Sequence, residues 1–210
     1  MNILILNTSE LTGGAAVAAN RLAKALGKSG VEVSMLVRDR KTGDEWVTAL
    51  NDSFWASRWN FIRFVWERLI IFICNHFRRK PLFQVSIANT GTDLSDHPLV
   101  KAADVIHLHW INQGFLSLAD IRKLALIGKP IVWTMHDMWP CTAICHYSFG
   151  CERFKKECGE CPFLSSSDKK DLSYHVFNKK RFLADSKIQL VAVSTWLRQQ
   201  AQDSALTNRL

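Results

Sequence analysis

Short apolar runs alternate with helical patterns along the N-terminal part of the chain. Residues 1–7 (MNILILN) form an apolar run typical of a buried strand, and residues 31–37 (VEVSMLV) form a second one. Between them, apolar positions recur at helical spacing from Ala15 to Leu26, and Gly30 provides a stop. Strand, glycine turn, helix and strand in this order predict the beginning of a parallel α/β sheet.

The same alternation continues through the rest of the chain. It predicts strands at 104–110, 130–135 and 188–193, and helices at 118–127, 173–184 and 195–204. Ser194 is expected to cap the last of these helices. Residues 41–51 are polar and are expected to form a loop. The pattern therefore predicts one α/β domain in which helices flank a parallel sheet.

Residues 54–80 carry a helical pattern of unusual composition. Large apolar residues recur at helical spacing with arginines between them: Trp55, Trp59, Ile62, Trp66, Leu69, Ile70, Ile73 and Phe77 with Arg58, Arg63, Arg68, Arg78 and Arg79. We expect a basic amphipathic helix that Pro81 ends and in which Cys74 is buried. Such a helix suits an anionic membrane surface. The alternative is a helix that packs on its own domain and leaves its arginines in water.

Composition limits the class of protein. The chain has 210 residues, of which 48% are hydrophobic and 22% charged, as in an ordinary globular domain. Its net charge of +8 favours an anionic partner, such as a phosphorylated sugar, a membrane surface or nucleic acid. No nucleic-acid recognition motif is present, so a zinc-stabilised nucleic-acid binder is the weakest hypothesis and no nucleic acid partner is expected. The sequence shows no secretory signal and no apolar run of roughly 18 residues, so we expect a cytoplasmic protein with reduced cysteines.

Polar residues cluster where three of the predicted strands end. The clusters are residues 12–14 (TGG), 107–112 (HLHWIN) and 136–139 (HDMW). Glycines let a ligand approach the backbone, and a helix N-terminus attracts phosphate, although two glycines at such a turn are more often structural than functional. His107 and His109 should share one face of their strand. Because ligands collect at the carboxyl ends of parallel strands, we expect a site where the clusters meet.

A cysteine-rich loop is predicted at residues 140–164. Four of its thiols lie close together in the sequence: Cys145, Cys151, Cys158 and Cys161. The last pair, in CGEC, resembles a zinc knuckle, in which a tight turn brings two thiolates to one ion. A structural zinc would order a loop that has little apolar content of its own. Disulfides formed on oxidation, or free thiols, are the alternatives.

Several motifs together resemble one known family. They are GGAA (13–16), ADVIHLHW (103–110), WTMHDMWP (133–140), CHY (145–147), CERF (151–154), CGECP (158–162) and VSTWL (193–197). In order and spacing they resemble bacterial family 4 glycosyltransferases of the exopolysaccharide and colanic-acid type, over nearly the whole chain. The sequence departs from the family pattern at Cys141, where an apolar residue is usual, and at Ala143 and Ile144, where two glycines are usual. The loop is therefore expected to differ in shape.

The resemblance implies a GT-B architecture, in which two Rossmann-like domains face a cleft. Residues 1–210 would form the N-terminal, acceptor-side domain, with a Rossmann-like sheet and the loop at 140–164 as an insertion, and the C-terminal nucleotide-sugar domain would be absent. Family members transfer a hexosyl group with retention of configuration and need no catalytic metal. The chain alone is then expected to be inactive. A non-catalytic acceptor-binding module, or a half-enzyme that pairs with a separate donor domain, is the alternative.

The resemblance also implies roles for particular residues. His136 matches the histidine that contacts the donor sugar near the reacting carbon, and it would be the catalytic residue. Gly13 and Gly14 would approach the donor phosphates, and the acceptor side would be lined by His109, Trp110 and Asp137. The expected reaction moves a sugar from a nucleotide-sugar to a lipid-linked or oligosaccharide acceptor in cell-surface polysaccharide synthesis, at the inner face of the membrane.

Overall fold

The computed structural model describes residues 1–80, 82–166 and 168–208. Six strands pair in parallel in one sheet of order β3-β2-β1-β4-β5-β6. They are β1 (Asn2–Ser9), β2 (Glu32–Asp39), β3 (Val47–Ala49), β4 (Val105–Leu108), β5 (Ile131–Met135) and β6 (Gln189–Ala192). This is the order of a Rossmann-like, doubly wound sheet, which confirms the predicted fold class.

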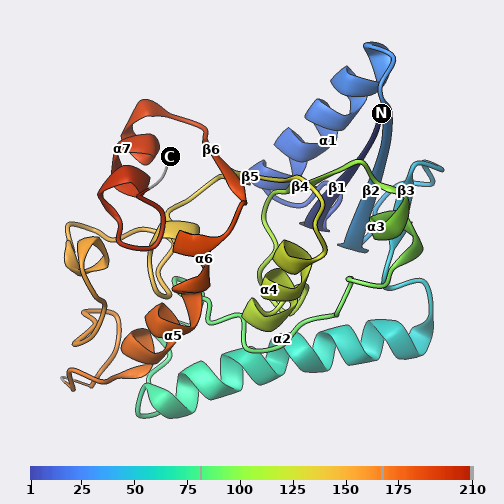
Figure 1. Ribbon diagram of the computed structural model, residues 1–210. Coiled ribbons are helices and arrows are strands. Elements are labelled where there is room, and N and C mark those ends of the chain that lie inside the picture. The colour runs from blue at the N-terminus through green and yellow to red at the C-terminus, as the bar shows by residue number, and fades with distance from the viewer. Residues whose placement is uncertain (81, 167, 209–210) are drawn as a thin grey trace.

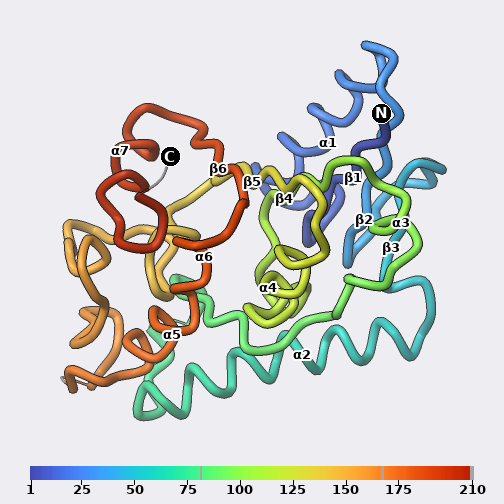
Figure 2. Tube along the Cα trace, in the orientation of Figure 1, coloured from blue at the N-terminus to red at the C-terminus, as the bar shows by residue number. Residues whose placement is uncertain are grey.

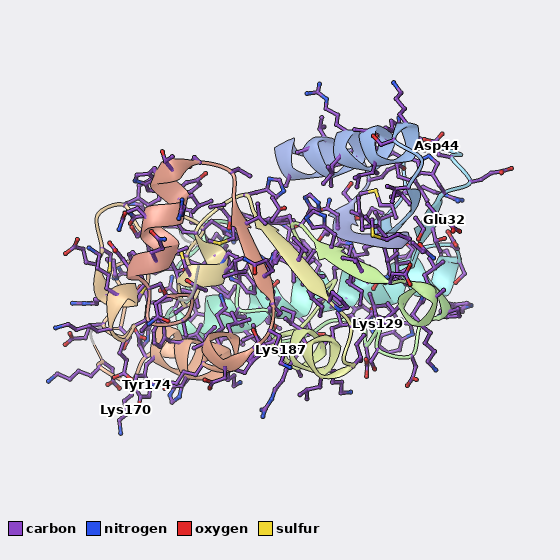
Figure 3. The ribbon with its side chains drawn as sticks, turned by 45° about the horizontal axis from the view of Figure 1, so that its top comes forward. Glu32, Asp44, Lys129, Lys170, Tyr174 and Lys187 are labelled. Carbon is purple, nitrogen blue, oxygen red and sulfur yellow. The ribbon has the colours of Figure 1, made fainter. Side chains whose placement is uncertain are left out.

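Helices cover both faces of the sheet (Figure 1). One face packs against α1 (Gly14–Lys28) and α7 (Thr195–Asp203), and the other against α3 (Pro98–Ala102), α4 (Leu118–Leu126), α5 (Leu172–Lys180) and α6 (Phe182–Asp185). The long helix α2 (Phe54–Cys74) runs along the outside of this second layer, as the trace in Figure 2 shows. Charged side chains such as Glu32, Lys170 and Lys187 point outwards at the periphery (Figure 3).

The central strand β1 shows why the layers form. Ile3 and Ile5 pack in the cluster that holds α1, whereas Leu4 and Leu6 pack on the opposite face in the cluster that holds α4. A strand buried on both faces appears in the sequence as a continuous apolar run. Because β1 pairs with β2 on one side and β4 on the other, its carboxyl end and that of β4 lie where the strand order reverses.

Two further elements, η1 (Trp139–Cys141) and η2 (Arg153–Lys155), are 3-10 turns in the cysteine-rich loop. Some local predictions were wrong. The expected loop at 41–51 contains the edge strand β3, which is too short to show a pattern, and α3 was not predicted. The helix expected at 173–184 is two helices that meet at Arg181.

The helix expected at 54–80 ends at Cys74 instead. Asn75 caps it, and His76 and Phe77 then adopt positive φ angles of 51° and 61°, which turn the chain out of the helix. Cys74 is exposed, which corrects the expectation that it is buried. Residue 81, expected to end the helix, lies outside the described residues.

Candidate active site

A cleft of about 570 Å³ opens at the carboxyl ends of β1, β2, β4 and β5. Five residues predicted from the sequence line it together: Gly13, Gly14, Trp110, His136 and Asp137. Further lining residues include Asn7, Arg38, Gln113 and Tyr147. The glycine turn after β1 and the histidine after β5 therefore stand on one edge of the sheet, beside the point where the strand order reverses.

The turn between β1 and α1 presents backbone N–H groups to this cleft. Gly13 is the N-cap of α1 and has a φ of 91°, a left-handed conformation that favours glycine. The first-turn residues Gly14, Ala15 and Ala16 also line the cleft, and N–H groups at this position of a helix have no intrahelical acceptor. With no acidic residue in that turn, the helix N-terminus offers a partial positive charge and free donors to a phosphate.

Three histidines form a stacked row beside the glycine turn. The rings of His107, in β4, and His109, just after its end, lie 4.4 Å apart between centroids, which confirms that they point to the same side. His109 Nδ1 lies 2.9 Å from His136 Nε2, and the two rings stack with their centroids 5.2 Å apart. His107 Nε2 lies 2.8 Å from the Thr134 hydroxyl. Only His136 of the three lines the cleft, so His109 supports His136 from behind.

The hydrogen-bond partners of His109 indicate which ring carries the proton in the bond between His109 and His136. His109 Nε2 is buried and has no partner. If that nitrogen carried the proton, a buried N–H would be unpaired, which is rarer and more costly than an unpaired acceptor. The proton therefore belongs on His109 Nδ1, which donates to His136 Nε2. Neutral His136 must then carry its own proton on Nδ1, where it can donate to a ligand in the cleft.

Burial keeps this row uncharged. Burial lowers the pKa of His107 to about 4, with a smaller contribution from His136. Burial lowers the pKa of His109 to about 3, with smaller contributions from His107 and His136. Burial also lowers the pKa of His136, although Asp137 opposes the shift. All three imidazoles are therefore neutral at pH 7, which makes them hydrogen-bonding groups rather than cationic ones.

The depressed pKa values predict that the chain loses stability on mild acidification. The unfolded histidines take up protons near pH 6.5, whereas His107 and His109 in the folded chain do not until about pH 4 and 3. The unfolded state therefore binds more protons, and the free energy of unfolding should fall by about 1.4 kcal/mol per pH unit for each histidine as pH drops from 6.5 to 4.5. Urea unfolding at a series of pH values measures this slope. Substitution of His107 by Gln should reduce it, and a flat profile would contradict the buried, neutral row.

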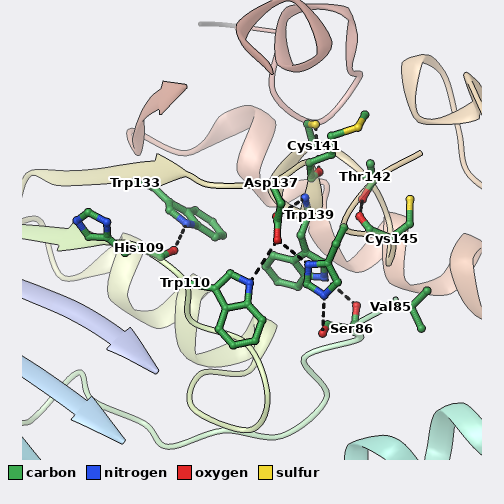
Figure 4. Close-up of polar contacts among 12 residues, drawn as sticks. Val85, Ser86, His109, Trp110, Trp133, Asp137, Trp139, Cys141, Thr142 and Cys145 are labelled. Atoms are coloured by element: carbon green, nitrogen blue, oxygen red, sulfur yellow. Dashed lines mark hydrogen bonds and ion pairs between the residues drawn. The ribbon is translucent and has the colours of Figure 1, made fainter. Parts of the chain in front are cut away.

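Asp137 follows His136 and organises a second set of contacts (Figure 4). Its Oδ2 accepts hydrogen bonds from His146 Nδ1 at 2.7 Å and from Trp110 Nε1 at 3.3 Å. Its Oδ1 accepts from the Trp139 backbone N–H at 2.8 Å. His146 is held in turn by its Nε2, 3.1 Å from the Ser86 hydroxyl. Because both oxygens are occupied, Asp137 positions these side chains rather than acting as a free base.

A second hollow of about 300 Å³ adjoins the cleft at Asp137. It shares Trp110, Gln113, Asp137 and Tyr147 with the larger cleft and adds Arg68, Phe83, Gln84, Ser86, His146 and Phe149. The exposed Tyr147 ring stacks on Trp196 with 6.3 Å between centroids. Asp137 thus borders both a glycine-walled cleft and an aromatic hollow.

Some residues of this site could not be recognised from the sequence alone. Asn7 lies inside the first apolar run, yet its Oδ1 accepts the Trp110 backbone N–H at 2.8 Å and so ties β1 to the end of β4. His146 and Tyr147 lie in the cysteine-rich loop, where the motif marked the position without indicating a contact to Asp137. For Asn7, the sequence did offer one signal of a structural or functional role, which is that a polar residue lies in a run of buried apolar residues.

The cysteine-rich loop is ordered by packing. Ile144 and Phe154 are buried, which corrects the expectation that the loop has too little apolar content to order itself. Fully buried Lys180 donates to the carbonyl oxygens of Trp139 at 2.6 Å and Thr142 at 3.1 Å, and its Nζ lies 3.3 Å from the centroid of the Trp139 ring. Burial lowers the pKa of Lys180 to about 7. Lys180 thus holds in place the start of the loop, which follows Asp137 in the sequence.

The four cysteines proposed for zinc surround one small apolar pocket. Cys145, Cys151, Cys158 and Cys161 all line it, and all are free thiols. Burial raises the pKa of Cys158 and Cys161 to about 12. Among the residues that the structure describes, no three cysteine, histidine, aspartate or glutamate side chains are placed to hold a metal ion. The structural zinc therefore stays a prediction.

Comparison with known proteins decides the family. The family described as Glycosyltransferase Family 4 matches residues 12–207, which include the glycine turn, the histidine row and the cysteine-rich loop. The chain belongs to Glycosyltransferase Family 4. This confirms the resemblance inferred from the motifs.

A curated protein is also similar to part of the chain. The chain is 35% identical over 70 residues to a protein of Escherichia coli (strain K12) named "Putative colanic acid biosynthesis glycosyl transferase WcaC". That match covers 33% of this chain and 17% of the relative's own length. No solved structure matches the chain.

Proposed function

We propose that the cleft takes part in a retaining transfer of a hexosyl group from a nucleotide-sugar to a lipid-linked or oligosaccharide acceptor. The chain would supply the acceptor-side lobe of a GT-B enzyme of cell-surface polysaccharide synthesis, as a peripheral protein at the cytoplasmic face of the membrane. Family membership supports the reaction class, and the similarity to WcaC supports the polysaccharide setting. The observation that carries the proposal is that Gly13, Gly14 and His136 line one cleft.

Charge development in the reaction matches the donors on this edge of the sheet. As the bond between the sugar's anomeric carbon and the diphosphate breaks, negative charge grows on the leaving diphosphate. The N–H groups after Gly13 are preorganised to stabilise that charge. The Nδ1–H of neutral His136 would donate to a sugar hydroxyl beside the reacting carbon. His136 would not be the general base, because its other nitrogen is occupied by His109.

The acceptor would occupy the side of the cleft that Trp110 and Asp137 share with the aromatic hollow. Tyr147 and Phe149 expose flat rings there, which suit the apolar faces of a sugar. His109 was expected on this side from the family resemblance. In the structure it is buried behind His136, so we assign it a positioning role instead.

Substitution of Gly14 by Ala tests the proposal without disturbing the fold. An added Cβ at Gly14 would meet nothing within 4 Å, so it would project into open space at the start of α1. If a diphosphate packs against this backbone, the methyl group should lower glycosyl transfer by about tenfold by holding the phosphates away from the N–H groups. Transfer from labelled nucleotide-sugars to membrane-extracted acceptors measures this in the complete gene product that contains the chain.

The matched control is Gly27→Ala. Gly27 lies in the last turn of the same helix, and a Cβ there would also meet nothing within 4 Å. This variant should transfer sugar at the unsubstituted rate. Equal activity of both variants would refute a diphosphate at the glycine turn.

A further inference from the structure

The helix α2 differs from an ordinary surface helix, because three of the four residues that it buries, Asn60, Glu67 and Arg68, are polar or charged. Glu67 is fully buried, and its Oε1 accepts the backbone N–H groups of Ile87 at 2.8 Å and Ala88 at 2.9 Å. Arg68, next along the helix, donates to the carbonyl oxygens of Leu82 and Val85. These bonds fasten α2 to the extended segment beside it and fix which side of the helix faces outwards.

The outward face of α2 is apolar. Exposed fractions reach 73% for Trp55, 60% for Trp59 and 51% for Trp66. We call this side of the helix the outer face. Besides the three tryptophans it contains Phe61, Ile62, Val65, Leu69 and Ile73, each at least 41% exposed. A helix normally turns such residues towards the core. An apolar surface of this extent on a soluble domain marks a place where something else binds.

The charges around the outer face have one sign. Within residues 54–80 the exposed charged side chains are Arg58, Arg78, Arg79 and Lys80, and the one acidic residue, Glu67, is buried. Exposed tryptophans among basic residues complement a bilayer with anionic headgroups, where the rings sit at the interface and the cations pair with lipid phosphates. In the part of the chain described here, no helix combines the length and apolar character needed to cross a bilayer.

We propose that α2 docks its outer face on an anionic membrane and lies parallel to its surface. The surface is less suited to a second copy of the chain. An antiparallel pairing of two α2 helices would bring Arg58 of one copy towards the basic cluster 78–80 of the other, and a parallel pairing would oppose the clusters directly.

The aromatic hollow also reaches α2. Phe83 is 72% exposed, lines that hollow, and lies 6.0 Å from the Arg68 guanidinium that α2 contributes. The hollow therefore extends from Arg68 on α2, past Phe83, to Asp137. A role for the hollow as the route of a lipid-linked acceptor to the cleft rests on the proposed function. The membrane contact itself does not depend on it.

Vesicle sedimentation of the 210-residue chain tests the docking face. The chain should bind vesicles containing about 30% phosphatidylglycerol, bind neutral phosphatidylcholine vesicles weakly, and release from anionic vesicles at about 0.5 M NaCl. The triple variant W55A/W59A/W66A should bind about 30-fold more weakly, because the three rings would no longer enter the interface. Circular dichroism would verify that the variant is folded.

The matched control is Trp196→Ala, which removes a tryptophan that is 51% exposed but lies on α7, away from α2. Its vesicle binding should be unchanged. Equal binding by the triple variant and the parent would overturn the proposal. The proposal would also be overturned if the unsubstituted chain did not bind anionic vesicles. A dimer of that chain in sedimentation equilibrium that the triple substitution dissociates would overturn it as well. None of these results depends on glycosyl transfer, so they leave the Gly14 test independent.

Discussion

Substitution of His136 by Ala should lower turnover of the complete gene product by about 10²–10³-fold, the usual effect of removing one preorganised donor from a reacting centre. The loss should fall mainly on kcat, because the imidazole would contact the sugar beside the carbon where charge develops. Steady-state transfer from the nucleotide-sugar measures both kcat and KM. Near-normal activity would contradict the catalytic assignment.

The proton on His136 Nδ1 leads to a more specific prediction, because Asn and Gln replace different ring nitrogens. The amide nitrogen of Asn can occupy the place of histidine Nδ1, and the amide oxygen of Gln can occupy the place of Nε2, where it accepts from His109. Because His136 is assigned its proton on Nδ1, His136→Asn keeps a donor towards the cleft and should retain more activity than His136→Ala. His136→Gln can keep the contact to His109 but loses that donor, so it should resemble the Ala variant. The reverse order would show that the proton lies on Nε2.

Substitution of Glu67 by Ala should destabilise the chain by about 4 kcal/mol. The change leaves two backbone N–H groups without an acceptor, and it leaves the Arg68 guanidinium, which lies 2.9 Å from Glu67 Oε2 and is 10% exposed, without its carboxylate. Urea unfolding measures the free energy.

Two further variants separate the causes. Glu67→Gln keeps an oxygen for the two N–H groups and should lose less than the Ala variant. Glu45 is exposed, so Glu45→Ala should leave the free energy of unfolding within about 0.5 kcal/mol of the parent. An unchanged Glu67→Ala protein would show that polar contacts do not hold α2 in its observed orientation.

The sheet and the edge that carries the site were predictable, because both follow from local signals. An apolar run such as 1–7 is buried on either face of a parallel sheet, and turns after parallel strands must meet at one edge. This placed the glycine turn beside His136 without coordinates. The prediction of a loop at residues 41–51 was wrong because a three-residue edge strand is too short to show a periodic pattern.

The orientation of α2 was not predictable for a different reason. Helical spacing shows that Trp55, Trp59 and Trp66 lie on one side, but the pattern is the same whether that side faces the core or the surroundings. The answer depends on Glu67 finding the N–H groups of residues 87 and 88, about 20 positions away in the sequence. The network of Asp137 with Ser86 and His146 is likewise formed by segments that no local pattern connects.

His136 and Asp137 are consecutive residues, yet the first lines the glycine-walled cleft and the second also borders the aromatic hollow. Their α-carbons are separated by one peptide unit, about 3.8 Å, which thermal motion of the loops cannot change. If donor and acceptor occupy the two spaces as proposed, the backbone positions of one residue that contacts the donor sugar and one that contacts the acceptor are held at a separation set by covalent geometry. Drift of the strand tip would then carry both substrates together, so the alignment of sugar and nucleophile would survive motions that a pair of separate loops would not.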